Sequence, residues 1–235
     1  MNLPISRRLL ACCNFVCKGD RVADIGCDHG YLSIHLLKNH IAGAVIASDI
    51  GEGPLKSAIA NAEKYGVSDN IRFYLSDGVR SIPREFDCLI IAGMGGDTMI
   101  SILEAAPWLQ NKSYRLVLQC QTRVHLLRRY RSEKGWHIED ESTVRDGKFV
   151  YTVISAGWDP DAPRLTPGQM YFSPTLLQHP GEDTAEYYQR LLFSLRRAIH
   201  GRGENADPWM VAALAELAPL EETHTWLKEA SPWQP

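Results

Sequence analysis

The chain has 235 residues, of which 45% are hydrophobic and 23% charged, and its formal net charge is -3. This length suits one α/β domain with an additional segment, or two small domains. The composition excludes a disordered, collagen-like or rod-shaped chain, and no apolar run reaches the roughly 18 residues that a membrane-spanning helix needs. The segment MNLPISRRLLACCNF carries arginines where a secretory signal would be apolar, so we expect a cytoplasmic protein.

The six cysteines form no C-x-x-C pair, and no histidine lies at zinc-ligand spacing. We therefore expect free thiols in a reducing compartment, with no disulfide and no metal site. No feature of the sequence indicates an oligomer, and we favour a monomer that makes no contact with a membrane.

Between residues 20 and 122, short β-branched runs alternate with longer helical stretches, which is typical of βαβ units and a parallel sheet. The predicted strands are Arg21–Cys27, Ala44–Ile50, Ile71–Ser76, Phe86–Ala92 and Arg115–Gln121. The predicted helices are Tyr31–Asn39, Pro54–Tyr65, Asp97–Ala106 and Val124–Lys134.

Two extended runs follow, His137–Val144 and Phe149–Ala156, and the Asp-Gly pair between them predicts a hairpin. Five parallel strands closed by an antiparallel hairpin resemble the Rossmann-like class I methyltransferase fold. A dehydrogenase would continue with a parallel sixth strand. We therefore predict an α/β protein with a seven-stranded, mostly parallel sheet, whose methyltransferase domain covers residues 1–157.

Residues 158–235 are predicted to form a linker and a small helical C-terminal domain. The segment up to Pro180 is rich in proline and glycine. Asp183-Thr-Ala-Glu186 has capping-box spacing and predicts a helix start, and Asp207-Pro208 predicts a second start before a break at Pro219.

The segment Ala23-Asp-Ile-Gly-Cys-Asp-His-Gly-Tyr-Leu32 joins the first predicted strand to a helix through a glycine-punctuated turn. Such a turn brings backbone N–H groups close to a ligand, although a purely structural turn would use the same glycines. A dinucleotide fingerprint would need glycine at positions 28 and 31, where this chain has Asp28 and Tyr31. A carboxylate at position 28 suits a ligand with a cationic amino group, such as S-adenosylmethionine.

Three further elements end the next strands: Asp49, Asp77-Gly78 and Ala92-Gly-Met-Gly-Gly96. Open α/β sheets bind ligands at this edge, where an acidic side chain can accept hydrogen bonds from ribose hydroxyls. The candidate cofactor-binding residues are Arg8, Gly26, Asp28, Gly30, Tyr31, Asp49, Ile50, Asp77, Gly78, Gly93, Met94 and Gly95.

Together with Leu3-x-x-Ser6-x-Arg8-Leu9 and Gly53-Pro54, these motifs resemble the bacterial tRNA (adenine-N1)-methyltransferase family that acts on adenine 22. The pairing of Asp-His-x-Tyr-Leu with Ala-Gly-Met-Gly-Gly is the specific part of this likeness, which spans residues 1–157. The resemblance implies attack of adenine N1 on the methyl group of S-adenosylmethionine, with tRNA as the partner. We expect Asp28 or His29 to accept a proton from the adenine amino group, and Arg8 could clamp the cofactor carboxylate.

A cluster of cations is predicted to contact RNA phosphates, which positions RNA without reading its sequence. Its members are Arg7, Arg123, Arg128, Arg129, Arg131 and Lys134. A solvated helix face would show the same charges. Two rival functions stay open: a methyltransferase for a small-molecule or protein acceptor, and a non-catalytic RNA-binding module on the same scaffold.

Overall fold

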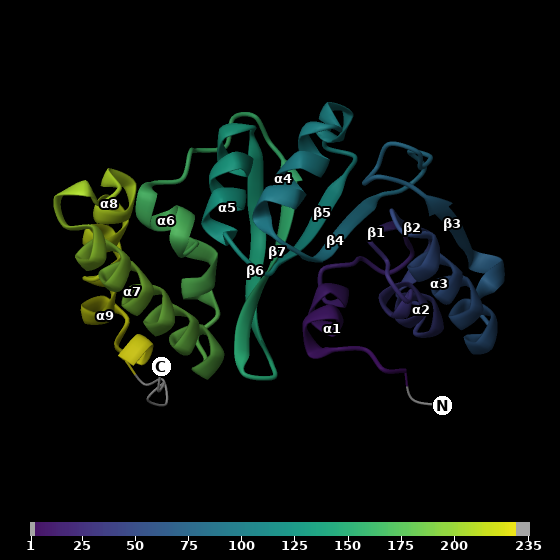
Figure 1. The fold of residues 1–235 in the computed structure, drawn as a ribbon, viewed down its shortest axis with the longest axis horizontal. Helices are drawn as coiled ribbons and strands as arrows, with labels where there is room; N and C mark the ends of the chain where they lie inside the picture. The colour runs from purple at the N-terminus through teal and green to yellow at the C-terminus, as the bar shows by residue number, and fades with distance from the viewer. Residues whose placement is uncertain (1–2, 229–235) are drawn as a thin grey trace.

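The computed structural model describes residues 3–228 (Figure 1). The strands are β1 (Asp20–Ile25), β2 (Ala42–Asp49), β3 (Ile71–Leu75), β4 (Cys88–Met94), β5 (Arg115–Cys120), β6 (Trp136–Asp146) and β7 (Phe149–Trp158). The α-helices are α1 (Arg7–Cys13), α2 (Tyr31–Lys38), α3 (Glu52–Tyr65), α4 (Gly96–Glu104), α5 (Val124–Glu133), α6 (Pro167–Tyr171), α7 (Glu182–Arg202), α8 (Pro208–Leu217) and α9 (Leu220–Thr223). Short 3-10 helices lie at Ser68–Asn70, Pro107–Leu109, Pro174–Gln178, Gly203–Asn205 and Thr225–Lys228.

All seven strands form one sheet in the order β3-β2-β1-β4-β5-β7-β6. Strands β1 to β5 are parallel, whereas β7 runs antiparallel to both β5 and β6. Gly147 makes the hairpin turn with a left-handed φ of 62°, which glycine adopts without a steric penalty. The predicted class I methyltransferase fold and its terminal hairpin are confirmed.

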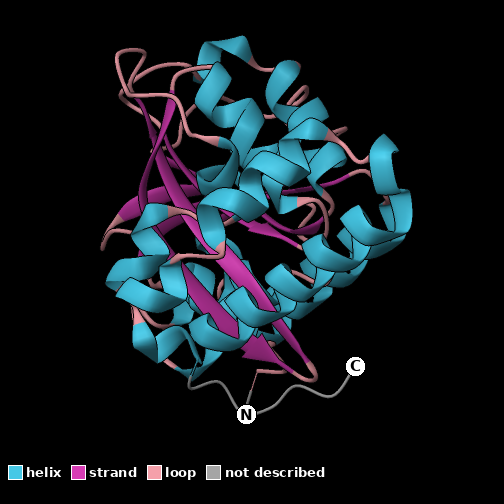
Figure 2. Cartoon of the chain, turned by 90° about the vertical axis from the view of Figure 1, so that its left-hand side faces the viewer, coloured by secondary structure: helices cyan, strands magenta, loops and turns pink. Residues whose placement is uncertain are grey.

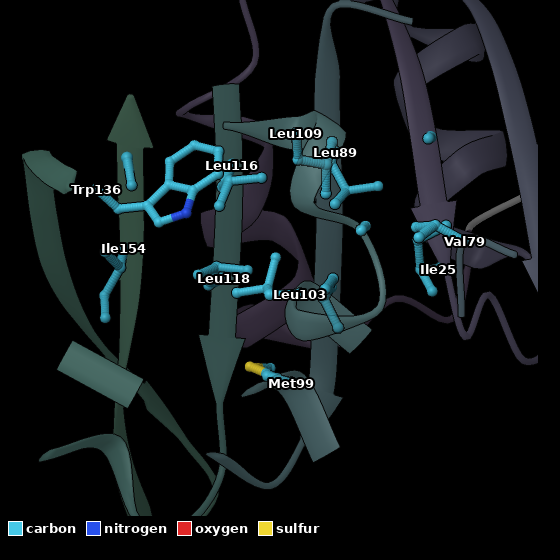
Figure 3. Close-up of a cluster of buried hydrophobic side chains, with 14 of the residues drawn as sticks. Ile25, Val79, Leu89, Met99, Leu103, Leu109, Leu116, Leu118, Trp136 and Ile154 are labelled. Atoms are coloured by element: carbon cyan, nitrogen blue, oxygen red, sulfur yellow. The ribbon is translucent and has the colours of Figure 1, made fainter. Parts of the chain in front are cut away.

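The parallel strands are apolar on both faces, because helices cover both. Alternate residues such as Leu89 and Leu116 pack beneath α4 and α5, in the buried cluster drawn in Figure 3. Their neighbours Ile90 and Val117 point the other way, toward α1, α2 and α3. This alternation fixes the register of each strand, since a shift by one residue would exchange the two faces.

The helices from α6 onward pack around their own apolar cluster, in which Tyr188, Leu192 and Leu217 are fully or almost fully buried. We call residues 167–228 the C-terminal lobe (Figure 1, left; Figure 2). The lobe packs against α5 and the outer strand β6. Tyr188 donates a hydrogen bond from its hydroxyl to the carbonyl of Leu217 at 2.7 Å, which ties α7 to α8.

Two local predictions need correction. The prediction that Asp183 caps the long helix is wrong, because α7 begins at Glu182 after Gly181 and the Asp183 carboxylate binds Arg145 instead. Strand β4 begins and ends two residues later than predicted, at Cys88 and Met94, and a register shift between Ala92 and Met94 bends its end.

No helix within residues 3–228 is both long and apolar enough to cross a membrane. Over the same range, no three His, Cys, Asp or Glu side chains are grouped to hold a metal ion. All six cysteines are free.

Candidate functional site

A cavity of about 790 Å³ lies where the parallel strands end. Its walls come from α1, from the loops after β1, β2 and β3, and from the β4–α4 connection. Of the predicted cofactor residues, it is lined by Arg8, Gly26, Asp28, Tyr31, Asp49, Ile50, Asp77, Gly78, Gly93 and Met94. The volume is that of a pocket for a nucleoside-sized ligand.

Gly30 and Gly95 are not among the lining residues. Gly30 begins α2 at a φ of 72°, and a Cβ there would stand 3.1 Å from the Cβ of Ala58. Gly95 precedes α4, where a Cβ would approach the Thr122 hydroxyl to 3.0 Å. Both glycines allow close packing behind the cavity wall, and their role as cofactor contacts stays a prediction.

Backbone hydrogen bonds connect the turn after β1 to β2. Gly26 N–H and Cys27 N–H both donate to the Ser48 carbonyl, at 2.8 and 2.9 Å. Gly26 and Asp28 take left-handed φ values of 73° and 51°. Residues other than glycine rarely adopt this backbone conformation, so hydrogen bonds to β2 must hold Asp28 in it.

Asp49, the last residue of β2, accepts the hydrogen bond that holds Asp28. Its carboxylate accepts the Asp28 N–H at 3.0 Å and the Gly51 N–H at 2.9 Å. The same side chain lines the cavity, so one carboxylate orders the turn and remains available to ribose hydroxyls. The next residue, Ile50, is 73% exposed and offers an apolar surface at the rim.

The cavity is strongly acidic. Its carboxylates are those of Asp24, Asp28, Asp49, Asp77 and Asp97. Asp77 pairs with Arg80 at 2.9 Å on the open side. Among the described residues that line the cavity, Arg8 is the only lysine or arginine. This charge distribution suits a ligand that carries positive groups and one negative group.

Asp24 is a cavity residue that sequence reasoning missed. Its side chain is only 3% exposed and accepts a hydrogen bond from the Ser33 hydroxyl at 2.6 Å. Burial raises the pKa of its carboxyl from 3.8 to about 6. The group is therefore mostly ionised at neutral pH, and it fits a cationic amino group. An acidic residue inside the apolar run Val22–Ile25 was the signal that could have revealed it.

The end of β4 forms the floor. Gly93 N–H donates to the side-chain oxygen of the fully buried Gln119 at 3.1 Å, a contact between β4 and β5 that the sequence did not indicate. Met94 lies over Gly26, so that a Cβ at position 26 would collide with its methyl carbon. Thr98, Ser101 and Ile102 of α4 also line the cavity and were not predicted.

Asp28 and His29, the predicted proton acceptors, lie together on the rim. The His29 Nε2 atom is 3.7 Å from the Asp28 carboxylate, and both side chains are more than half exposed. The His29 ring also lies 5.8 Å from the Tyr31 ring. A flat group that enters from solvent would meet these side chains before it reached the floor.

Comparison with known proteins identifies the family of this chain. The methyltransferase domain family matches residues 5–154. The tRNA (adenine(22)-N(1))-methyltransferase of Bacillus subtilis strain 168 is 34% identical over 162 residues, which are 68% of each chain. The crystal structure of the B. subtilis m1A22 tRNA methyltransferase superposes with a TM-score of 0.77 at 29% identity, over 97% of this chain and 99% of that one. Sp1610 of Streptococcus pneumoniae, solved in complex with S-adenosyl-L-methionine, gives a TM-score of 0.80 at 28% identity, over 91% and 99%.

This chain belongs to the tRNA (adenine(22)-N(1))-methyltransferase family. The predicted family resemblance is thus confirmed. Because the structural match covers 97% of the chain, the helical C-terminal lobe is part of the shared architecture and not an unrelated addition.

For a tRNA methyltransferase, the predicted phosphate-binding arginines fall into two groups. Arg7 is exposed on α1. Arg123 precedes α5 and pairs with the cavity residue Asp97 at 2.9 Å, with both side chains 62% exposed. The Arg129 side chain is 43% exposed, pairs with Glu133 at 2.9 Å and lies 4.7 Å from the ring of Trp209 in the C-terminal lobe. These three arginines are accessible to RNA.

Arg128 and Arg131 are not accessible, and their prediction as RNA contacts is wrong. Both side chains are fully buried. The Arg128 guanidinium pairs with the equally buried Glu141 at 2.5 Å and donates to the carbonyls of Met170 and Tyr171 at 3.1 and 2.7 Å. Burial opposes its charge, but Glu141 holds the pKa of Arg128 above its ordinary value, whereas burial lowers the pKa of Arg131 to about 10.

Proposed function

We propose that this chain transfers the methyl group of S-adenosylmethionine to N1 of adenine 22 in tRNA. One structural observation carries this proposal: a single nucleoside-sized cavity at the strand ends combines several carboxylates with one arginine. S-adenosylmethionine has a sulfonium, an ammonium and a carboxylate, so its charges complement this set. The family relationship names the acceptor base and the nucleic acid.

The residues of this chain divide the cofactor between them. Asp49, Ile50, Asp77 and Gly78 line the cavity. Asp49 would receive the ribose hydroxyls, Ile50 would cover one face of the adenine, and Asp77 with Gly78 would border its amino group. Asp24 and Asp28 would hold the ammonium group, and Arg8 would bind the carboxylate. S-adenosylmethionine, when bound, would supply an electrophilic methyl group near Gly93 and Met94.

The acceptor needs little chemical activation, because the lone pair of adenine N1 is free at neutral pH. The protein therefore acts mainly by positioning the base and excluding water. After transfer the adenine is cationic, and Asp28 or His29 accepts a proton from its amino group. An imidazole suits this role at neutral pH better than a carboxylate.

N1 lies on the pairing edge of adenine, so the base must be unpaired or flipped to reach the cavity. Arg7 and Arg123 are exposed and Arg129 is partly exposed. We expect these three arginines to contact the flanking phosphates. A tRNA substrate supports a cytoplasmic location.

The decisive experiment offers the protein two tRNA transcripts, one with adenine and one with guanine at position 22. We expect 1-methyladenosine only in the first, as measured by nucleoside mass spectrometry, and none with the Asp49→Ala variant. Tight cofactor binding without methylation of either transcript would contradict a tRNA acceptor. It would instead favour a small-molecule or protein acceptor.

Charge reversal separates RNA binding from cofactor binding. Arg123→Glu with Arg129→Glu should weaken tRNA binding by about tenfold or more while binding of S-adenosylhomocysteine changes less than twofold. Filter binding at two salt concentrations and calorimetry would measure these effects. Unchanged tRNA affinity would show that RNA approaches from another side.

A further inference from the structure

Arg8, the one arginine among the described residues that line the cavity, is held by a residue outside the cavity. Arg8, on α1, directs its Nη1 atom to the Asp146 carboxylate at 3.2 Å. The other end of the guanidinium lies beside the floor, because its Nη2 atom is 3.8 Å from where a Cβ of Gly93 would stand. Arg8 thus spans the distance from the cavity floor to the end of the hairpin.

The guanidinium has unused hydrogen-bonding capacity. It carries five N–H donors, and Asp146 is its one acceptor among the described residues. Its Nε atom is buried and has no partner within the described part of the chain. A carboxylate accepts two parallel bonds from a guanidinium, and the carboxylate is the only anionic group of the cofactor.

The hairpin end that carries Asp146 is itself fixed by ion pairs of the neighbouring residue Arg145. It is the last residue of β6, immediately before the turn glycine Gly147. Successive side chains of a strand point to opposite faces, so Arg145 faces the C-terminal lobe while Asp146 faces α1. Arg145 pairs with Asp183 at 2.8 Å and with Glu186 at 2.6 Å, both on α7. The hairpin end is therefore fixed between α7 and α1.

We propose that Asp146 is a positioning residue that orients the Arg8 guanidinium toward the cofactor carboxylate. Arginine has a long side chain with many rotamers, and ordering it at the moment of binding would cost affinity. Asp146 selects one orientation before the cofactor arrives. This inference rests on the proposed contact between Arg8 and the carboxylate.

The test compares two ligands by calorimetry with the full-length protein: S-adenosylhomocysteine and its decarboxylated analogue, which keeps the adenosine, sulfur and amino group. Asp146→Asn should weaken binding of S-adenosylhomocysteine by about tenfold and change binding of the analogue less than twofold. Asp146→Glu should recover most of the loss. Glu85→Gln is the control, because it removes one partner of an exposed ion pair with Arg72 that involves neither the hairpin nor α1, and it should change neither affinity.

The variant Arg8→Met distinguishes the positioning role of Asp146 from the proposed contact between Arg8 and the cofactor carboxylate. If Arg8→Met weakens only S-adenosylhomocysteine and Asp146→Asn changes nothing, Arg8 binds the carboxylate without help, and the positioning role is overturned. Equal losses of both ligands in Asp146→Asn would also overturn it, since they would indicate a general structural role. If Arg8→Met does not discriminate between the ligands, the carboxylate contact fails and the inference fails with it. None of these binding measurements involves tRNA, so their outcome is independent of the proposed acceptor.

Discussion

Single residues around the cavity combine two tasks. Asp49 orders the turn after β1 by accepting the Asp28 N–H, and it lines the cavity. Gly26 permits a left-handed backbone and leaves space for Met94. Because each task depends on the shape of one side chain, small substitutions here should change binding more than stability.

Gly26→Ala should lower affinity for S-adenosylhomocysteine by about tenfold or more and destabilise the fold by about 1 kcal/mol. The new methyl group collides with the flexible Met94 side chain and forces it to move. Calorimetry and urea unfolding measure the two effects. The control is Gly53→Ala on α3, where a Cβ meets no atom within 4 Å and neither property should fall. Unaltered affinity in Gly26→Ala would show that the close approach is unnecessary.

The buried Asp24 predicts a specific pH dependence. Its pKa is raised from 3.8 to about 6, so between these values the folded state keeps a proton that the unfolded state has lost. The free energy of unfolding contributed by this group therefore falls as the pH rises from about 4 to about 6, and then becomes constant.

Asp24→Asn removes this titration. The free energy of unfolding of the variant minus that of the wild type should rise by about 2 kcal/mol between pH 4 and pH 7. Urea unfolding of the ligand-free proteins at several pH values measures the difference. A difference that does not depend on pH would show that Asp24 is not protonated in the folded state within this range.

At the scale of elements, α5 has two opposite roles. Its exposed face carries Arg129, and its buried face carries Arg128, whose ion pair with Glu141 joins α5 to β6. Arg128 also caps two carbonyls at the end of α6, so three elements meet at one guanidinium. A buried pair of this kind is costly to break, because the remaining charge stays out of water.

Arg128→Met should therefore destabilise the protein by about 3 to 5 kcal/mol, whereas Arg129→Met should cost less than about 1 kcal/mol. Urea unfolding of the two variants makes the comparison. Charge reversal at Arg128 would report on folding and not on RNA contact. Equal stability of both variants would contradict the buried pair.

At the scale of the molecule, the C-terminal lobe is joined to the sheet domain by polar contacts as well as apolar ones. Arg145 binds α7, Arg128 binds α6, and Arg129 lies over Trp209 of α8. Arg129 belongs to α5, and the residue that precedes this helix, Arg123, pairs with the cavity residue Asp97. An RNA held at the cavity could thus touch both parts of the protein.

A chain that ends at residue 157 tests whether the predicted domain of residues 1–157 is independent. We expect it to aggregate or to unfold at a much lower temperature than the full-length protein. Arg128 would lose its hydrogen bonds to the Met170 and Tyr171 carbonyls, and the face of α5 that packs against α6 would be exposed to water. Thermal circular dichroism and size-exclusion chromatography provide the measurement. A soluble fragment that unfolds cooperatively near the full-length midpoint would show that the domain stands alone.

The sequence by itself determined the features that depend on local pattern. Alternating strands and helices, the Asp-Gly turn and the acidic strand ends predict the sheet, the hairpin and the position of the cavity, because parallel strands must end at one edge. Asp28, Asp49 and Asp77 were found in this way.

The tertiary structure alone decided which side chains are buried and which distant groups they meet. Arg128 and Arg129 are neighbours with the same charge, yet Glu141 and the α6 carbonyls lie on one side of α5 and solvent on the other. Arg8 met Asp146 across 138 positions, and Asp24 acquired its raised pKa from burial among residues far along the chain. Such long-range pairing leaves no periodic trace in one sequence, because it depends on how whole elements pack.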